Sequence, residues 1–174
     1  LGFQIYQNQQ HSDPNPPSSL GIQFQAGERN LMAQTHPASW SELLLRRTEL
    51  AGVWTGDKLA FFVNGRTAPL SGPYQPNVQM DSLKGFVIGS HVHGNGTLVA
   101  GWGGVIERLR VSKSARYAAD YEPPLEYAVD ADALAVYRFD EGRGATLNDA
   151  SGNGHHGTIV KATWVDTTKP ATDR

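Results

Sequence analysis

The chain contains no cysteine, which excludes disulfide bonds and a thiol nucleophile. No apolar run approaches the roughly 20 residues that a membrane-spanning helix needs, so we do not expect insertion into a membrane. Neither sign of charge dominates, because 15 Lys and Arg residues stand against 17 Asp and Glu residues and the net charge is −2. Since the sequence has no basic stripe, we do not expect a nucleic-acid partner.

Glycine and proline are abundant, whereas long helix-forming runs are scarce. The 174 residues include 19 Gly and 10 Pro, a composition typical of a turn-rich all-β domain. The length fits one domain.

The segment Ala51 to Arg66, AGVWTGDKLAFFVNGR, carries the clearest structural pattern. Apolar residues recur at every second position from Leu59 to Val63, which is the period of a strand with one buried face. Gly56-Asp57 and Asn64-Gly65 are typical of tight turns, because Gly and Asn tolerate a positive φ. The segment therefore predicts an antiparallel hairpin with Phe61 in the core.

Other segments repeat this pattern. The expected strands are Gly2 to Tyr6, Gly21 to Gln25, Thr48 to Trp54, Lys84 to Gly89, Gly104 to Ser112, Ala133 to Phe139 and Thr158 to Val165. Between them, we expect His91 to Gly104 to be largely a glycine-rich surface loop and Ala119 to Asp132 to be an exposed crossing. The patterns together predict antiparallel sheets with little helix.

Four segments resemble the motifs of one family. They are ELAGVWTGDKLAFFVNGR, GFVIGS, GGVIERLRVSKSARY and LAVYRFDEGRGATLNDASGNGHHGTIVKATWV, and they span roughly residues 48 to 165. Together they are similar to the laminin G-like branch of the concanavalin A-like lectin/glucanase superfamily, and the last two resemble copies in exported bacterial proteins of planctomycete type. The resemblance implies an all-β fold, an antiparallel two-sheet jelly-roll sandwich.

The order of these motifs departs from the family pattern. The FDEG and SGNG motifs ordinarily open such a domain, yet here they follow the GGVIERLRV strand that ordinarily closes one. One organisation is a permuted single sandwich over residues 1–174, in which Ala133 to Val165 supplies closing strands. The other is the back of one domain joined to the front of the next. We expect the single sandwich, because domain termini are often close together and permutation is tolerated there.

A candidate cation site lies near the C-terminus. Asp140, Glu141, Asp149 and Asn153 gather oxygen donors in a glycine-rich segment, and oxygen is the ligand that Ca²⁺ prefers. Asp and Asn before glycine are also common turn formers whose side chains accept hydrogen bonds from backbone N–H groups. A calcium site and a set of turns are therefore both open, and the turns are favoured.

The leading ligand-contact residue is Trp102. It lies in the glycine-rich loop, where binding residues tend to concentrate, and an exposed indole there would stack on a ligand ring. A buried indole would instead close one end of the sandwich, and the sequence does not separate these alternatives. Arg110 and Tyr117 are the expected companions of Trp102 in a ligand site.

Catalytic signatures do not occur in the sequence. Glucanases of the superfamily carry carboxylates that alternate along one strand, and this chain has no E-x-D-x-E run. Asp140 and Glu141 are adjacent, so in a strand they would point to opposite faces. We therefore expect no enzyme.

The resemblance instead implies a non-catalytic recognition or adhesion module that binds glycan or a protein partner. It also implies a place within a larger exported protein, at the cell surface, in the periplasm or outside the cell. The alternative is a structural interaction subunit that docks onto a larger assembly without a sugar ligand.

Overall fold

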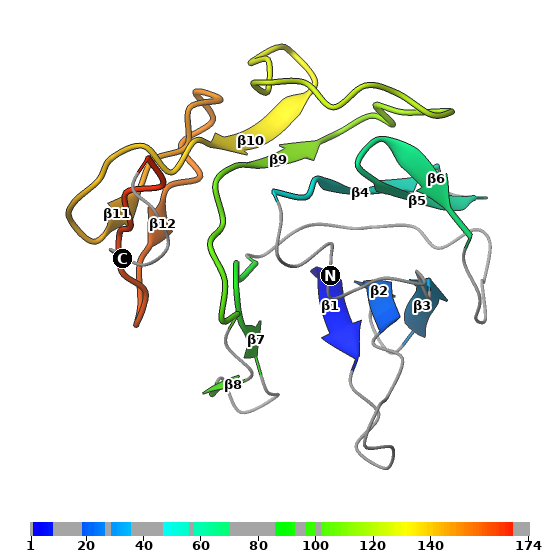
Figure 1. The fold of residues 1–174 in the computed structure, drawn as a ribbon, viewed down its shortest axis with the longest axis horizontal. Helices are drawn as coiled ribbons and strands as arrows, with labels where there is room; N and C mark the ends of the chain where they lie inside the picture. Colours follow the sequence, from blue (N-terminus) through cyan, green and yellow to red (C-terminus); the bar gives the residue numbers. More distant parts are fainter. Residues whose placement is uncertain are drawn as a thin grey trace. The chain divides into compact units, whose positions relative to one another are not determined.

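The computed structural model describes residues 2–8, 19–26, 29–35, 47–55, 58–69, 86–92, 97–99 and 102–168. This part of the chain consists of strands, turns and irregular segments, and it contains no helix (Figure 1). Accordingly, no described helix has the length and apolar character needed to cross a membrane. The strands form small antiparallel sheets of two or three strands each, so the expected β-only character is confirmed for the described residues.

The chain divides into two compact units. The first comprises Leu1–Phe86 and Ala115–Pro123, and the second comprises Val87–Ser114 and Pro124–Arg174. Each unit is therefore assembled from segments that are separate in the sequence.

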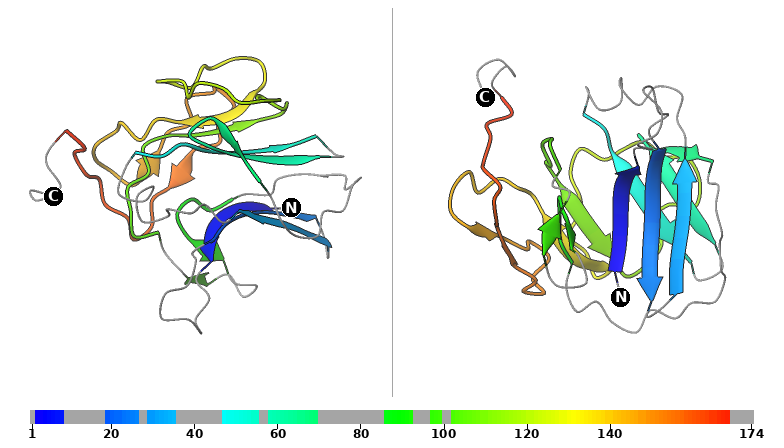
Figure 2. Two further views of the ribbon diagram at one scale, coloured as in Figure 1. Left: turned by 45° about the vertical axis from the view of Figure 1, so that its right-hand side comes forward. Right: turned by 90° about the horizontal axis from the view of Figure 1, so that it is seen from below.

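One sheet of the first unit contains β1 (Gly2–Asn8), β2 (Ser19–Ala26) and β3 (Arg29–Thr35). These strands lie side by side in that order, and both pairs are antiparallel (Figure 2). The sequence pattern predicts the first two strands and misses β3, in which Leu31, Met32 and Ala33 are consecutive and do not alternate with polar residues.

The second sheet of this unit contains β4 (Leu50–Trp54), β5 (Leu59–Val63) and β6 (Arg66–Ala68). The predicted hairpin between β4 and β5 is confirmed, with Trp54 opposite Leu59. Its turn residues Gly56-Asp57 lie outside the described residues. A second hairpin joins β5 to β6 through Asn64 (φ 50°) and Gly65 (φ 73°), because both turn positions need the left-handed backbone that Asn and Gly tolerate.

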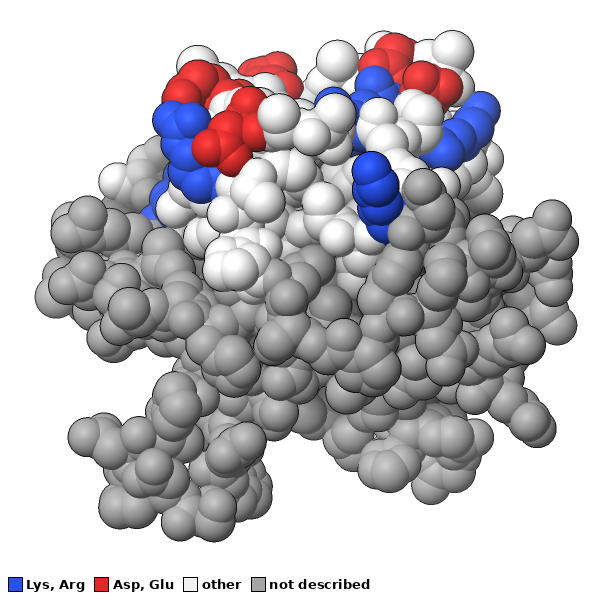
Figure 3. Space-filling view, turned by 90° about the vertical axis from the view of Figure 1, so that its right-hand side faces the viewer, with Lys and Arg blue, Asp and Glu red and all other residues white. Residues whose placement is uncertain are grey.

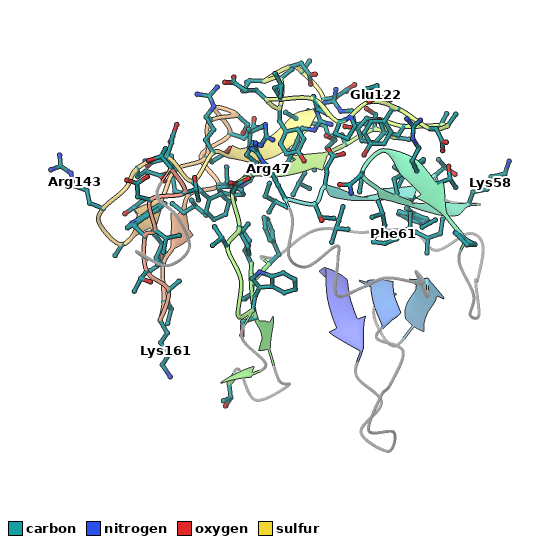
Figure 4. All side chains as sticks on the ribbon, in the orientation of Figure 1. Arg47, Lys58, Phe61, Glu122, Arg143 and Lys161 are labelled. Carbon is teal, nitrogen blue, oxygen red and sulfur yellow. The ribbon has the colours of Figure 1, made fainter. Side chains whose placement is uncertain are left out.

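Both faces of β5 are buried, and the expectation of a single buried face is wrong. The side chains of the adjacent residues Phe61 and Phe62 are both almost completely inaccessible, and adjacent strand residues point to opposite faces. Phe61 is in the core as predicted, whereas Val63 is half-buried. Figure 4 shows Phe61 on one side of this sheet and Glu122 on the other.

The segment Ala115–Pro123 supplies the cover for the Phe62 face. The Tyr117 and Tyr121 rings stack with their centroids 3.4 Å apart. Phe62 meets both edge-on, at 6.1 Å from Tyr117 and 5.5 Å from Tyr121. The Tyr121 hydroxyl donates to the Glu49 carboxylate at 2.9 Å. The alternating pattern of β5 could not predict this cover, because Tyr117 and Tyr121 lie more than 50 positions after Phe62 in the sequence.

Gly65 is the point where the hairpin turn meets this segment. The Tyr121 N–H donates to the Gly65 carbonyl at 2.8 Å. A Cβ added at Gly65 would overlap the Tyr121 carbonyl oxygen and touch the Pro123 ring. Glycine is therefore required here both for its backbone conformation and for its lack of a side chain.

The described residues of the second unit form six short strands. They are β7 (His91–Val92), β8 (Leu98–Val99), β9 (Leu109–Ser112), β10 (Ala133–Tyr137), β11 (Thr146–Leu147) and β12 (Gly157–Thr158). They pair antiparallel as β7 with β8, β9 with β10, and β11 with β12. The predicted loop His91 to Gly104 thus contains a short strand pair.

Several strand predictions in this unit are too long. Residues 86–89 form no strand, β9 covers only the end of Gly104 to Ser112, and Thr158 to Val165 is irregular after its first residue. Ile88, Leu109 and Phe139, which the pattern assigns to the core, are half-buried. Phe139 has a φ of 55°, so the strand cannot continue through it.

The first strand of the C-terminal segment, β10, pairs with the earlier strand β9. In β10, Tyr137 lies opposite Leu109 and Val136 lies opposite Arg110. The register shifts between Ala133 and Ala135, which marks an irregularity of the β-bulge kind. The described structure therefore joins Ala133–Tyr137 to β9 in one sheet.

The buried ring of Phe61 predicts a large loss of stability on truncation. We expect Phe61→Ala to lower the free energy of unfolding by about 3–5 kcal/mol, because it leaves a large cavity in a buried site. Urea unfolding followed by circular dichroism measures this loss. Lys58→Ala, an exposed position just before the same strand, is the control and should change stability by less than about 0.5 kcal/mol. Equal losses of stability in Phe61→Ala and Lys58→Ala would contradict the burial of Phe61.

Gly65 provides a second test, with Gly142 as its matched control. Both have a positive φ, 73° and 66°, but only a Cβ at Gly65 meets other atoms. Gly142→Ala should cost about 1 kcal/mol, the ordinary penalty for the left-handed region. Gly65→Ala should cost about 1–3 kcal/mol more, because the added methyl group is overpacked. Equal losses in the free energy of unfolding for both variants would contradict the close contact between Gly65 and Tyr121.

Candidate functional site

Trp102 lies in the irregular segment that leads to β9. Its side chain is 42% exposed, and its backbone N–H donates to the Gly89 carbonyl at 2.6 Å. Both residues belong to the second unit. The indole is therefore accessible, although its backbone is tied to the chain before β7.

Arg110 is held against an aromatic ring. Its guanidinium carbon lies 4.8 Å from the centroid of the Tyr127 ring, and that of Arg108 lies 5.7 Å from the same centroid. A cation over an aromatic face is attracted by the negative potential of the ring. Two arginines therefore share one half-buried tyrosine that the sequence analysis did not single out.

Tyr117 belongs to the other unit. Its ring stacks on Tyr121 and touches Phe62 edge-on, so it takes part in packing the first unit. The three expected ligand residues thus have different surroundings, and only Trp102 is exposed.

Asp149, expected as a cation ligand, accepts hydrogen bonds from the protein with both carboxylate oxygens. Oδ1 accepts from the N–H groups of Val136 and Ser151, both at 2.9 Å. Oδ2 accepts from the Ser151 hydroxyl at 2.8 Å and from the His155 N–H at 3.0 Å. The side chain is only 6% exposed. These contacts match the turn-forming interpretation, in which the carboxylate satisfies backbone donors.

Asn153 and Ser151 continue this arrangement along β10. The Asn153 amide donates to the carbonyls of Ala133 and Leu134 at 2.9 and 3.0 Å. The Ser151 hydroxyl oxygen lies 3.1 Å from the Leu134 carbonyl oxygen and 2.8 Å from Oδ2 of Asp149. Ser151 was missed by the sequence analysis, although the Asx and Ser turn chemistry of its segment could have indicated it. We name Asp149, Ser151 and Asn153 the polar clip.

The other two candidate cation ligands lie apart from these contacts. Glu141 Oε1 accepts from the Asn148 N–H at 2.6 Å, and its other oxygen is buried without a hydrogen-bond partner. Asp140 is exposed. Among the described residues, no three His, Cys, Asp or Glu side chains form a group that could hold a metal ion.

Hydrogen bonds from the protein lower the pKa of Asp149. Burial alone would raise this pKa, but the hydrogen bonds from Val136, Ser151 and His155 outweigh burial and bring the pKa to about 2. Burial, followed by the nearby Asp149 charge, raises the pKa of Tyr137, whose hydroxyl donates to the His155 carbonyl at 2.6 Å. Asp149 is therefore an ionised structural group at neutral pH.

Charged residues of both signs are interspersed on the described surface. Figure 3 shows basic side chains next to acidic ones on the face that it presents. Arg66, for example, pairs with Glu122 at 2.8 Å and approaches Asp120 at 3.9 Å. Such exposed pairs contribute little stability. Arg143 and Lys161 point outward from the C-terminal segment (Figure 4).

Comparison with known proteins gives no match. No family model, curated protein or solved structure matches this chain. The functional argument therefore rests on the residues themselves.

The lowered pKa of Asp149 predicts a pH-dependent contribution to stability. Since the folded state favours the carboxylate, about 2 kcal/mol of stability should be present at pH 7, above the unfolded pKa of about 3.9. This contribution is lost as the pH falls toward the folded pKa of about 2.

Asp149→Asn should therefore lower the free energy of unfolding at pH 7 by about 2 kcal/mol, and the difference from the wild type should shrink by pH 2.5. Urea unfolding at both pH values measures it. Asp140→Asn is the control, because this carboxylate lies in the same segment and is exposed. A pH-independent difference for Asp149→Asn would contradict the proposed role of its charge.

Proposed function

We propose that this chain is a non-catalytic recognition or adhesion module that binds glycan through Trp102. In this proposal the antiparallel sheets belong to a laminin G-like jelly-roll sandwich of the concanavalin A-like kind. The module serves within a larger exported protein, at the cell surface, in the periplasm or outside the cell.

The observation that carries the proposal is the exposure of Trp102. An indole that is 42% exposed costs free energy in water, and aromatic faces commonly form the centre of a binding site. A Trp side chain also loses little conformational entropy on binding, because it has only two rotatable bonds. The β-only character of the described residues agrees with the proposed fold.

Arg110 contributes less directly to this proposal. Its position over Tyr127 restrains the guanidinium, which could place a positive charge near a bound ligand. Tyr117 takes part in packing, and the proposal does not require it at the binding surface. A Ca²⁺ ion remains a hypothesis that the same experiment tests.

A structural interaction subunit is the second candidate, and Leu125 favours it. Its side chain is 84% exposed in the irregular segment after Pro124. Burying this side chain against a protein partner would remove apolar area from water. This role needs no sugar ligand.

Glycan-array binding with Ca²⁺ and with a chelator tests the first proposal. We expect the wild type to bind a defined set of glycans and Trp102→Ala to weaken that binding by about 30-fold, which corresponds to a hot-spot loss of about 2 kcal/mol. Val165→Ala is the control, because Val165 is also 42% exposed and lies in the same unit.

The melting temperature of each variant separates binding from packing. Loss of stability in Trp102→Ala with glycan binding intact would assign the indole to packing. Absence of binding by the wild type in both conditions would reject the glycan ligand and favour the structural candidate. Glycan binding that occurs with Ca²⁺ and is lost with the chelator would support the Ca²⁺ hypothesis.

A further inference from the structure

The indole of Trp102 lies directly over Gly104. A Cβ placed on Gly104 would be 2.6 Å from Trp102 Nε1, 3.1 Å from Cε2 and 3.5 Å from Cδ1. All three atoms belong to the five-membered ring of the indole. Since Cβ atoms do not approach other atoms as closely as 2.6 Å, the indole can take this position only while residue 104 has no side chain.

The base of the same side chain is restrained at Gly89. The Trp102 N–H donates to the Gly89 carbonyl, and a Cβ on Gly89, whose φ is 78°, would lie 3.7 Å from Trp102 Cβ. The backbone of Trp102 is thus held at Gly89 and its five-membered ring at Gly104. Cε2 is shared with the six-membered ring, whose other atoms are not among the three that lie nearest to a Cβ on Gly104.

We infer that Gly104 is a positioning residue that seats the Trp102 indole so that its six-membered ring stacks on the C–H face of a pyranose. This inference rests on the proposed glycan-binding function and names the chemical class of its ligand. Val105, the residue after Gly104, is 45% exposed and adds an apolar side chain to the same segment. A pyranose with several C–H bonds on one face suits such a surface, since stacking removes apolar area from water on both sides.

Gly103 supplies a matched control for the role of Gly104. The two glycines are adjacent, and neither has a positive φ, so alanine is compatible with both backbones. A Cβ on Gly103 has no atom within 4 Å. Any difference between Gly103→Ala and Gly104→Ala therefore reports the contact with the indole.

The first measurement needs no ligand. The indole N–H resonance of Trp102, assigned by its loss in Trp102→Phe, is recorded in the wild type and in both alanine variants. We expect Gly104→Ala to shift this resonance and Gly103→Ala to leave it in place, with both melting temperatures near that of the wild type. An unchanged resonance in Gly104→Ala would overturn the seating of the indole, whatever the ligand is.

The second measurement titrates methyl β-galactopyranoside and methyl β-glucopyranoside, with galactitol as the control. Galactitol carries similar hydroxyl groups but has no ring face. We expect at least one glycoside to shift the indole resonance of the wild type and galactitol not to shift it. Gly104→Ala should weaken binding of that glycoside by about tenfold or more, and Gly103→Ala by less than about twofold.

A double-substituted chain separates positioning from general damage. Phe at position 102 lacks the Nε1 edge that lies over Gly104, so adding Gly104→Ala to Trp102→Phe should cause no further loss of glycoside binding. Equal losses in both backgrounds would overturn the positioning role.

The outcomes also distinguish this inference from the proposed function. A shifted resonance in Gly104→Ala, together with no binding of glycosides or array glycans by the wild type, would reject the glycan function while the seating of the indole stands. Binding of array glycans without any response to either glycoside, or an equal response to galactitol, would reject the pyranose-stacking inference while the proposed function stands.

Discussion

The second unit depends on the hydrogen bonds that the Asp149 carboxylate accepts. This carboxylate is buried and accepts four hydrogen bonds, one from β10 and three from the turn that follows β11. A buried backbone N–H without an acceptor is costly, and Val136 in β10 has its acceptor in this side chain. The Ala150 N–H in turn donates to the Val136 carbonyl at 2.7 Å. The turn is thereby held against β10 although it forms no long strand of its own.

In the first unit, aromatic rings pack a distant segment against a short strand. β5 has large apolar side chains on both faces, and the Phe62 face is covered by the tyrosines of Ala115–Pro123. Gly65 lets that segment approach the turn closely. Tight turns and distant segments therefore provide packing that these short strands cannot provide for one another. Glycine also leaves room for a side chain at Trp102, where the indole occupies the space that a Cβ on Gly104 would need.

The candidate site was only partly predictable. The loop position of Trp102 left an exposed and a buried indole both open, and the structure shows that the residue is exposed. The contacts of Arg110 with Tyr127 and of Tyr117 with Tyr121 were not predictable, because each joins residues that no short-range pattern relates. Asp149 and Asn153 were open to two interpretations. Their contacts with β10 favour turns, since hydrogen bonds from the protein already engage both oxygens of Asp149.

Local chemistry by itself determined the β-only character of the described residues, the hairpin from β4 to β5 and the turn at Asn64-Gly65. These follow from side-chain alternation and from the tolerance of Asn and Gly for a positive φ, which are properties of neighbouring residues. Strand ends, the burial of both faces of β5 and the partners of Asp149 were decided only by the tertiary structure. They depend on which distant segment covers a face or satisfies a buried donor, and a local pattern carries no information about that choice.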